Sequence, residues 1–77
     1  MEVRGSRRAA RYIRKRGGVL YLWADEDALL RHATRKPAID AEFRRFHGPG
    51  FALDVQRHLN LGEHVTIERS PFCLGVC

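Results

Sequence analysis

The sequence predicts an α+β domain in which a basic N-terminal helix packs on a small, mainly antiparallel β-sheet. Three observations predict it: an arginine-rich segment with apolar residues at helical spacing, a continuous apolar run after a glycine pair, and later segments in which apolar and polar residues alternate. The 77 residues are 44% hydrophobic and 30% charged, a globular composition with room for one core. We expect a single domain over 1–77, with a basic helix in 1–16 and a strand-rich body in 18–77.

The first element is predicted to be a helix over roughly residues 6–16. Ala9, Ala10 and Ile13 lie at helical spacing and form a narrow apolar stripe. The stripe extends back to Val3, and arginines cover the rest of the surface. The glycine pair that follows supplies a left-handed stop for this helix.

The next two segments are predicted differently. Residues 19–24 form a continuous apolar run, which predicts a central strand covered on both faces. Residues 28–36 leave two alternatives, because local propensity slightly favours a short helix while the order of side chains also suits a strand.

The second half of the chain predicts further strands. Residues 43–46 and 51–56 flank a glycine-proline turn, which is typical of a hairpin. Apolar and polar residues alternate again over 64–68 and predict another strand. The tail, 72–77, is either one more short edge strand or a loose end.

Positive charge is concentrated at the N-terminus. Residues 1–16 hold seven bases and one acid, whereas residues 17–77 hold seven bases and eight acids. Such a patch neutralises phosphates more effectively than scattered charge does, and the alternative is a solvated helix face with no ligand. The candidate contacts to a nucleic acid or an acidic partner are Arg4, Arg7, Arg8, Arg11, Arg14, Lys15 and Arg16.

Two thiols stand at the C-terminus in a C-x-x-x-C pattern, at Cys73 and Cys77. Thiolates bind zinc and iron–sulfur clusters, so both cysteines are candidate metal ligands. His64 is a third candidate if the fold brings it close to Cys73. The alternative is a small buried residue at position 73 and an incidental thiol at position 77. An extended tail would hold the two sulfurs about 13 Å apart, so a shared metal requires a bend.

The sequence offers little for catalysis or for membrane insertion. Neither serine, Ser6 nor Ser70, lies in a nucleophile motif, and the turn at 48–50 lacks the Lys-Ser/Thr of a phosphate-binding loop. We therefore expect no enzyme activity. The longest apolar run has six residues against roughly 20 for a membrane span, and no export signal precedes it. These features predict a cytoplasmic protein that does not enter membranes.

Three segments resemble HesB-like proteins, which are relatives of the A-type iron–sulfur carriers. The segments are Arg16–Trp23, Ala33–Pro37 and Phe46–Val55, and the resemblance covers roughly residues 8–70. It implies a compact, strand-rich α+β domain with the helix at the N-terminus. It also favours the strand alternative for residues 28–36.

The resemblance implies a modified function, because the family's carriers use one cysteine after the first strand and a Cys-x-Cys pair near the C-terminus. This chain has no cysteine between Trp23 and Leu30, and Cys73 and Cys77 are spaced more widely. It therefore implies a non-enzymatic accessory protein, a degenerate iron–sulfur carrier or metal-binding domain. The alternative is a basic module that binds nucleic acid or an acidic protein through the first helix. A homodimer is a further expectation, because open sheet edges gain by pairing.

Overall fold

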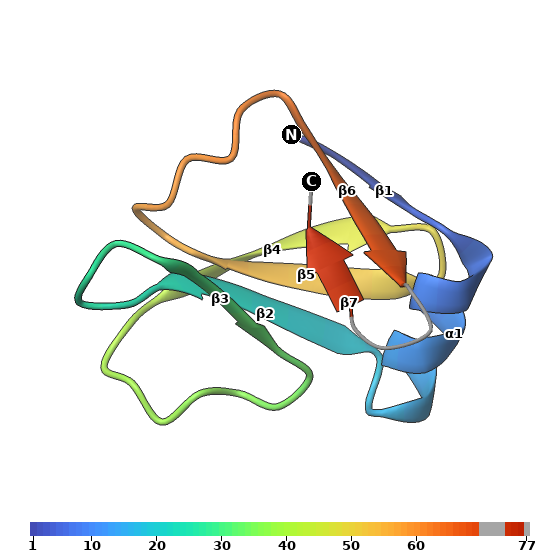
Figure 1. The fold of residues 1–77 in the computed structure, drawn as a ribbon, viewed down its shortest axis with the longest axis horizontal. Helices are drawn as coiled ribbons and strands as arrows, with labels where there is room; N and C mark the ends of the chain where they lie inside the picture. The colour runs from blue at the N-terminus through green and yellow to red at the C-terminus, as the bar shows by residue number, and fades with distance from the viewer. Residues whose placement is uncertain (70–73, 77) are drawn as a thin grey trace.

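The computed structural model describes residues 1–69 and 74–76, which form one helix and two small β-sheets (Figure 1). One sheet has three strands in the order β1-β6-β7, and the other has four in the order β3-β2-β5-β4. The elements in chain order are β1 (Glu2–Gly5), α1 (Arg7–Lys15), β2 (Val19–Ala24), β3 (Leu30–Ala33), β4 (Phe43–Gly48), β5 (Phe51–Gln56), β6 (His64–Arg69) and β7 (Leu74–Val76). The described residues are therefore α+β, with strands in two sheets where the sequence predicted one.

The predicted helix is present as α1, with Ser6 and Arg16 as its caps. The Ser6 hydroxyl accepts the backbone N–H of Ala9 at 3.1 Å, which satisfies one of the donors that a helix start leaves open. Gly17 and Gly18 take φ values of +117° and +86°, the left-handed backbone expected of a helix stop. No helix in the described ranges is long and apolar enough to cross a membrane.

The prediction that the basic segment is helical from residue 1 is wrong for its first residues, which form strand β1. β1 pairs in parallel with β6, and Val3 lies opposite Val65. Val3 is buried in the core from this strand rather than from the helix. Ser6 joins the two elements, because its backbone is still extended and bonded to β6 while its hydroxyl caps the helix.

The apolar run predicted as a central strand is β2, which lies inside the four-stranded sheet. It pairs in parallel with β5 on one side and antiparallel with β3 on the other. Leu20 and Leu22 are fully buried, whereas Tyr21 and Trp23 are half-buried. One face of β2 is thus shielded completely and the other only in part, which corrects the expectation of full cover on both faces.

The two alternatives for residues 28–36 resolve as strand β3. Residue Ala28 takes a φ of +61°, which turns the chain back after β2 and prevents a helix from forming there.

The predicted hairpin is confirmed as β4 and β5, which pair antiparallel from Phe43 opposite Gln56 to Gly48 opposite Phe51. Strand β6 is also confirmed, and the tail contributes the short strand β7, which pairs antiparallel with β6.

A single cluster of buried side chains joins the helix and both sheets. The α1 residues Ala9 and Ile13 are fully buried in it. The other members come from α1 and from four strands, and they are Val3, Ala10, Leu20, Leu22, Phe51, Leu53, Val55, Val65 and Ile67. The buried face of α1 is therefore narrow and apolar, and every basic side chain of the helix is exposed to solvent.

Candidate nucleic-acid interface

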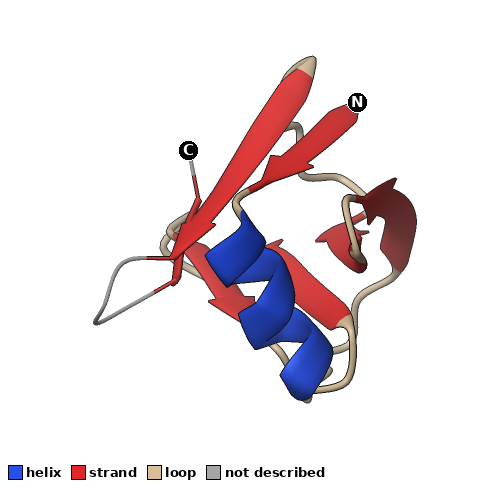
Figure 2. Cartoon of the chain, turned by 90° about the vertical axis from the view of Figure 1, so that its right-hand side faces the viewer, coloured by secondary structure: helices blue, strands red, loops and turns tan. Residues whose placement is uncertain are grey.

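Six of the seven predicted contact bases lie on α1 or on its C-cap, and all six are exposed. Figure 2 shows α1 at one end of the molecule with its outer side toward the viewer and no strand in front of it. We call these six residues the α1 basic surface: Arg7, Arg8, Arg11, Arg14, Lys15 and Arg16.

Arg4, the seventh predicted contact, does not belong to this surface. It lies on β1 and forms an ion pair with Glu2. The hydrogen bond from Arg4 holds the pKa of the Glu2 carboxyl below its ordinary value and raises the pKa of the guanidinium. The structure corrects the position of Arg4 from the helix to a strand, and its role as a contact residue stays a prediction.

The α1 basic surface has no acidic partner among residues 1–69 and 74–76. The sequence between Val3 and Ala24 contains no aspartate or glutamate. The four ion pairs of the described residues all involve arginines outside α1. The positive charges of the helix therefore repel one another and face solvent, an arrangement that a polyanion would stabilise.

Two depressions lie on either side of the exposed face of α1. The first has a volume of about 490 Å³ and lies between α1 and the β4–β5 turn, where Arg7, Arg11 and Arg14 face Pro49 and Gly50. These three arginines follow the i, i+4, i+7 spacing that places side chains on one side of a helix. The turn thus supplies the far wall of a basic cavity.

The second depression is smaller, about 210 Å³, and lies on the side of α1 that faces β6. Arg8, Arg11 and Lys15 line it together with Tyr12 and Arg69. Arg11 lines both depressions, so the two lie on either side of its side chain. Basic side chains therefore line both depressions, from the β4–β5 turn to the end of β6.

Tyr12 holds two guanidinium groups against its ring. The Cζ atom of Arg16 lies 4.5 Å from the ring centroid and that of Arg69 lies 4.0 Å from it. Cation–π contacts of this kind fix a guanidinium while leaving its edge N–H groups available to an acceptor. The ring is occupied by cations, so it does not serve as a platform for base stacking.

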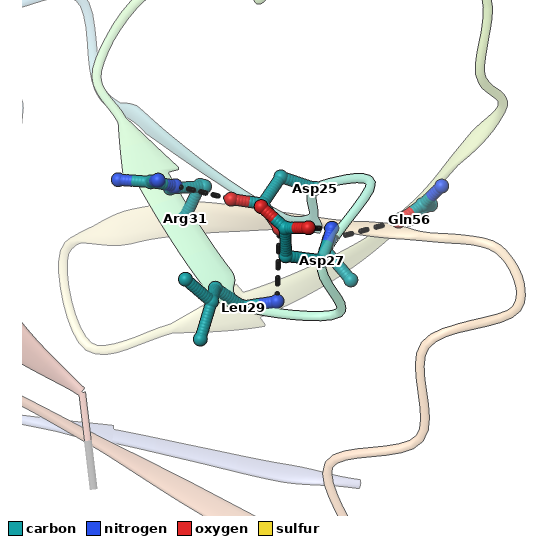
Figure 3. Close-up of polar contacts among 6 residues, drawn as sticks. Asp25, Asp27, Leu29, Arg31 and Gln56 are labelled. Atoms are coloured by element: carbon teal, nitrogen blue, oxygen red, sulfur yellow. Dashed lines mark hydrogen bonds and ion pairs between the residues drawn. The ribbon is translucent and has the colours of Figure 1, made fainter.

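Acidic side chains collect at the opposite end of β2, around a cavity of about 440 Å³ lined by Trp23, Ile39 and Asp40, among others. The carboxylate of Asp25 accepts the N–H groups of Asp27 and Leu29 and binds Arg31 at 2.7 Å (Figure 3). These contacts, with Arg31 first, hold the pKa of Asp25 below its ordinary value. Asp25 shapes the turn between β2 and β3.

The predicted metal ligands are not assembled in the described part of the chain. Cys73 and Cys77 lie outside the described residues. His64 is exposed on β6, where it lies opposite Glu2 of β1. Within 1–69 and 74–76, no three histidine, cysteine, aspartate or glutamate side chains lie close enough to hold a metal ion. The described residues therefore do not supply a ligand set for zinc or for a cluster.

Comparisons with protein-family models, with curated proteins and with solved structures give no match to this chain. Sequence reasoning found the helical bases but missed Tyr12, Arg69 and Gly50. The i, i+4 spacing of Tyr12 and Arg16 was a signal for one contact. Nothing in the local sequence indicated that β6 would bring Arg69 onto the same ring.

Proposed function

We propose that this protein binds nucleic acid through the sugar-phosphate backbone, using the α1 basic surface. The observation that carries the proposal is the set of six exposed bases, none of which forms an ion pair with a described residue. Neutralising phosphates with such bases releases condensed counterions and drives association.

The side chains on this surface favour backbone contacts over base recognition. Arginine forks match phosphate oxygens, and backbone contacts position a protein without reading sequence. The one aromatic ring of α1 already carries Arg16 and Arg69, which argues against stacking on single-stranded bases. A duplex, with its higher charge density, is therefore the preferred form of the ligand.

Fluorescence anisotropy tests this function. The full chain is titrated into a mixed-sequence DNA duplex and into a mixed-sequence RNA duplex. We expect binding that is nearly independent of sequence. Affinity should fall about 10²- to 10³-fold between about 50 and 200 mM salt, because about four to six phosphates are contacted. An affinity that does not respond to salt contradicts the proposal.

Charge reversal tests the surface itself. The variant Arg8→Glu, Arg11→Glu, Lys15→Glu should weaken duplex binding at least about 100-fold. A matched control, Arg35→Glu, Lys36→Glu, Arg44→Glu, changes the net charge equally at three exposed residues outside α1. Equal losses in the two variants would mean that net charge alone attracts the duplex. If neither duplex binds but an acidic protein does, the surface serves an acidic partner instead.

The metal-carrier function implied by the HesB-like resemblance stays a prediction, as does the homodimer. The two cysteines of the predicted metal site lie outside the described residues, and the described residues offer no ligand set. Metal and sulfide analysis after anaerobic reconstitution tests it. A protein that retains neither iron, sulfide nor zinc is not a carrier of this kind.

A further inference from the structure

The larger depression on the α1 basic surface is an open pocket with a strongly basic lining. Its volume of about 490 Å³ lies within the usual range of small-molecule sites. One wall is the side of α1 that carries Arg7, Arg11 and Arg14, and the other is the turn at Pro49 and Gly50. The pocket has room for a phosphate group together with part of the sugar to which it is attached.

The start of α1 borders this pocket, where Ser6 and Arg7 are among the lining residues. Ser6 provides the acceptors for the N–H groups of Ala9 and Ala10, through its hydroxyl and its carbonyl respectively. The N–H groups of Arg7 and Arg8 form no hydrogen bond with a described residue. These two donors carry the positive end of the helix dipole, and they add to the charge of the three guanidinium groups.

The β4–β5 turn lies beside one of those guanidinium groups. Gly50 takes a φ of +84°, and a side chain there would begin 3.9 Å from both Cζ and Nε of Arg14. The positive φ explains the glycine at this position, and the turn lies within ordinary contact distance of the Arg14 side chain.

We propose that this pocket, formed by Arg7, Arg11 and Arg14 opposite the Gly50 turn, is a seat for one phosphate group. The inference rests on the proposed function, since it identifies where a backbone phosphate of the duplex is held. Three planar donors of fixed geometry provide bidentate hydrogen bonds, which a mobile ammonium does not. The seat therefore depends on the identity of its arginines as well as on their charge.

Two charge-conserving variants of the full chain test the seat. Arg7→Lys, Arg14→Lys changes the pocket, and the control Arg35→Lys, Arg44→Lys makes the same exchange at two exposed arginines outside α1. We expect the first variant to bind the mixed-sequence duplex about tenfold more weakly than the parent, because bidentate hydrogen bonds to a charged group are lost. The second variant should bind like the parent.

Inorganic phosphate is the second probe, added to the labelled protein in a phosphate-free buffer and followed by amide chemical shifts. We expect saturable shifts at Arg7, Arg8 and Gly50 in the parent and in the control variant. The shifts should be lost in Arg7→Lys, Arg14→Lys. Shifts spread evenly over α1, or equal duplex affinities in the two variants, overturn the seat.

The outcomes separate the seat from the function on which it rests. If charge reversal on α1 abolishes duplex binding while both lysine variants bind like the parent, the protein binds nucleic acid and the seat is refuted. If phosphate shifts are confined to the pocket and depend on Arg7 and Arg14, but no duplex binds, the seat is supported for a free phosphate and the nucleic-acid function is refuted.

Discussion

Single side chains at the ends of several elements accept hydrogen bonds from backbone N–H groups. Ser6 does so at the start of α1, and Asp25 does so in the turn after β2. Gln56, at the end of β5, accepts the N–H of Ala24 at 3.0 Å and so joins two neighbouring strands of one sheet. Each of these residues satisfies a donor that the regular hydrogen-bond pattern leaves open.

The Asp25 carboxylate makes stability depend on acid. Its pKa is lowered from 3.8 by the hydrogen bond from Arg31 and by the backbone N–H groups, so its contribution is complete at neutral pH. The contribution of Asp25 to the free energy of unfolding begins to fall when the pH drops below about 4, and it is lost as the pH passes through the lowered pKa. The reason is that the protonated acid no longer attracts Arg31. We expect Asp25→Asn to be less stable than the parent at pH 7, by a margin that narrows as pH falls below about 4.

Urea unfolding at a series of pH values measures this difference. Asparagine keeps an oxygen for the N–H groups of the turn, so the variant isolates the charge. The control is Asp27→Asn, since the side chain of Asp27 makes no hydrogen bond with a described residue. A stability difference between Asp25→Asn and the parent that stays constant down to pH 2 would disprove the assignment.

At the scale of the elements, the two sheets approach each other where β1 passes the end of β4. Gly5 and Gly48 lie at this approach, and the ring of Phe51 packs against both. A Cβ at Gly48 would lie 2.8 Å from Cγ1 of Val3 and 3.1 Å from Cζ of Phe51. The absence of side chains at the two glycines therefore allows β1 to join the core beside the hairpin.

Gly48→Ala should destabilise the protein by about 1–3 kcal/mol, because an overpacked core forces Val3 and Phe51 to shift. The loss should be smaller in a Val3→Ala background, in which the nearest contact has been removed. Chemical denaturation of the parent, both single variants and the double variant measures this coupling. Fully additive effects would show that Val3 and Gly48 do not restrict each other.

At the scale of the whole molecule, charge is separated along the four-stranded sheet. The α1 basic surface lies at the end where β2 begins, and the acidic turn lies where β2 ends (Figure 1). Between them a single core holds the helix and both sheets. A chain of this size has roughly 3–5 kcal/mol of stability to lose, so the α1 basic surface depends on that core remaining intact.

Leu53→Ala should remove most of this stability. Leu53 is fully buried on β5, which lies between β2 and β4, and truncating a buried leucine costs about 2–5 kcal/mol. The control is Leu30→Ala on the edge strand β3, where the residue is 42% exposed and the cost should be about 0.5 kcal/mol. Circular dichroism during urea unfolding measures both. Equal midpoints for the parent and Leu53→Ala would contradict the position of the core.

The sequence determined the features that depend on neighbouring residues. Helical spacing with a glycine pair predicted α1, the apolar run predicted β2 as an inner strand, and alternation around the glycine-proline turn predicted the β4–β5 hairpin. Periodicity reports which side of an element is apolar, and this was enough to place the bases on the outside of α1. Most of the α1 basic surface was therefore predictable.

Only the tertiary structure decided how distant segments pair. β1 was assigned to the helix because Val3 continues an apolar stripe, yet its partner is β6, some sixty residues away along the chain. The same long-range pairing divides the strands between two sheets and brings Arg69 onto the ring of Tyr12. The pocket opposite Gly50 likewise requires the hairpin turn to meet α1. Local spacing holds no information about such contacts, because strand pairing is stabilised by whichever segment completes the core.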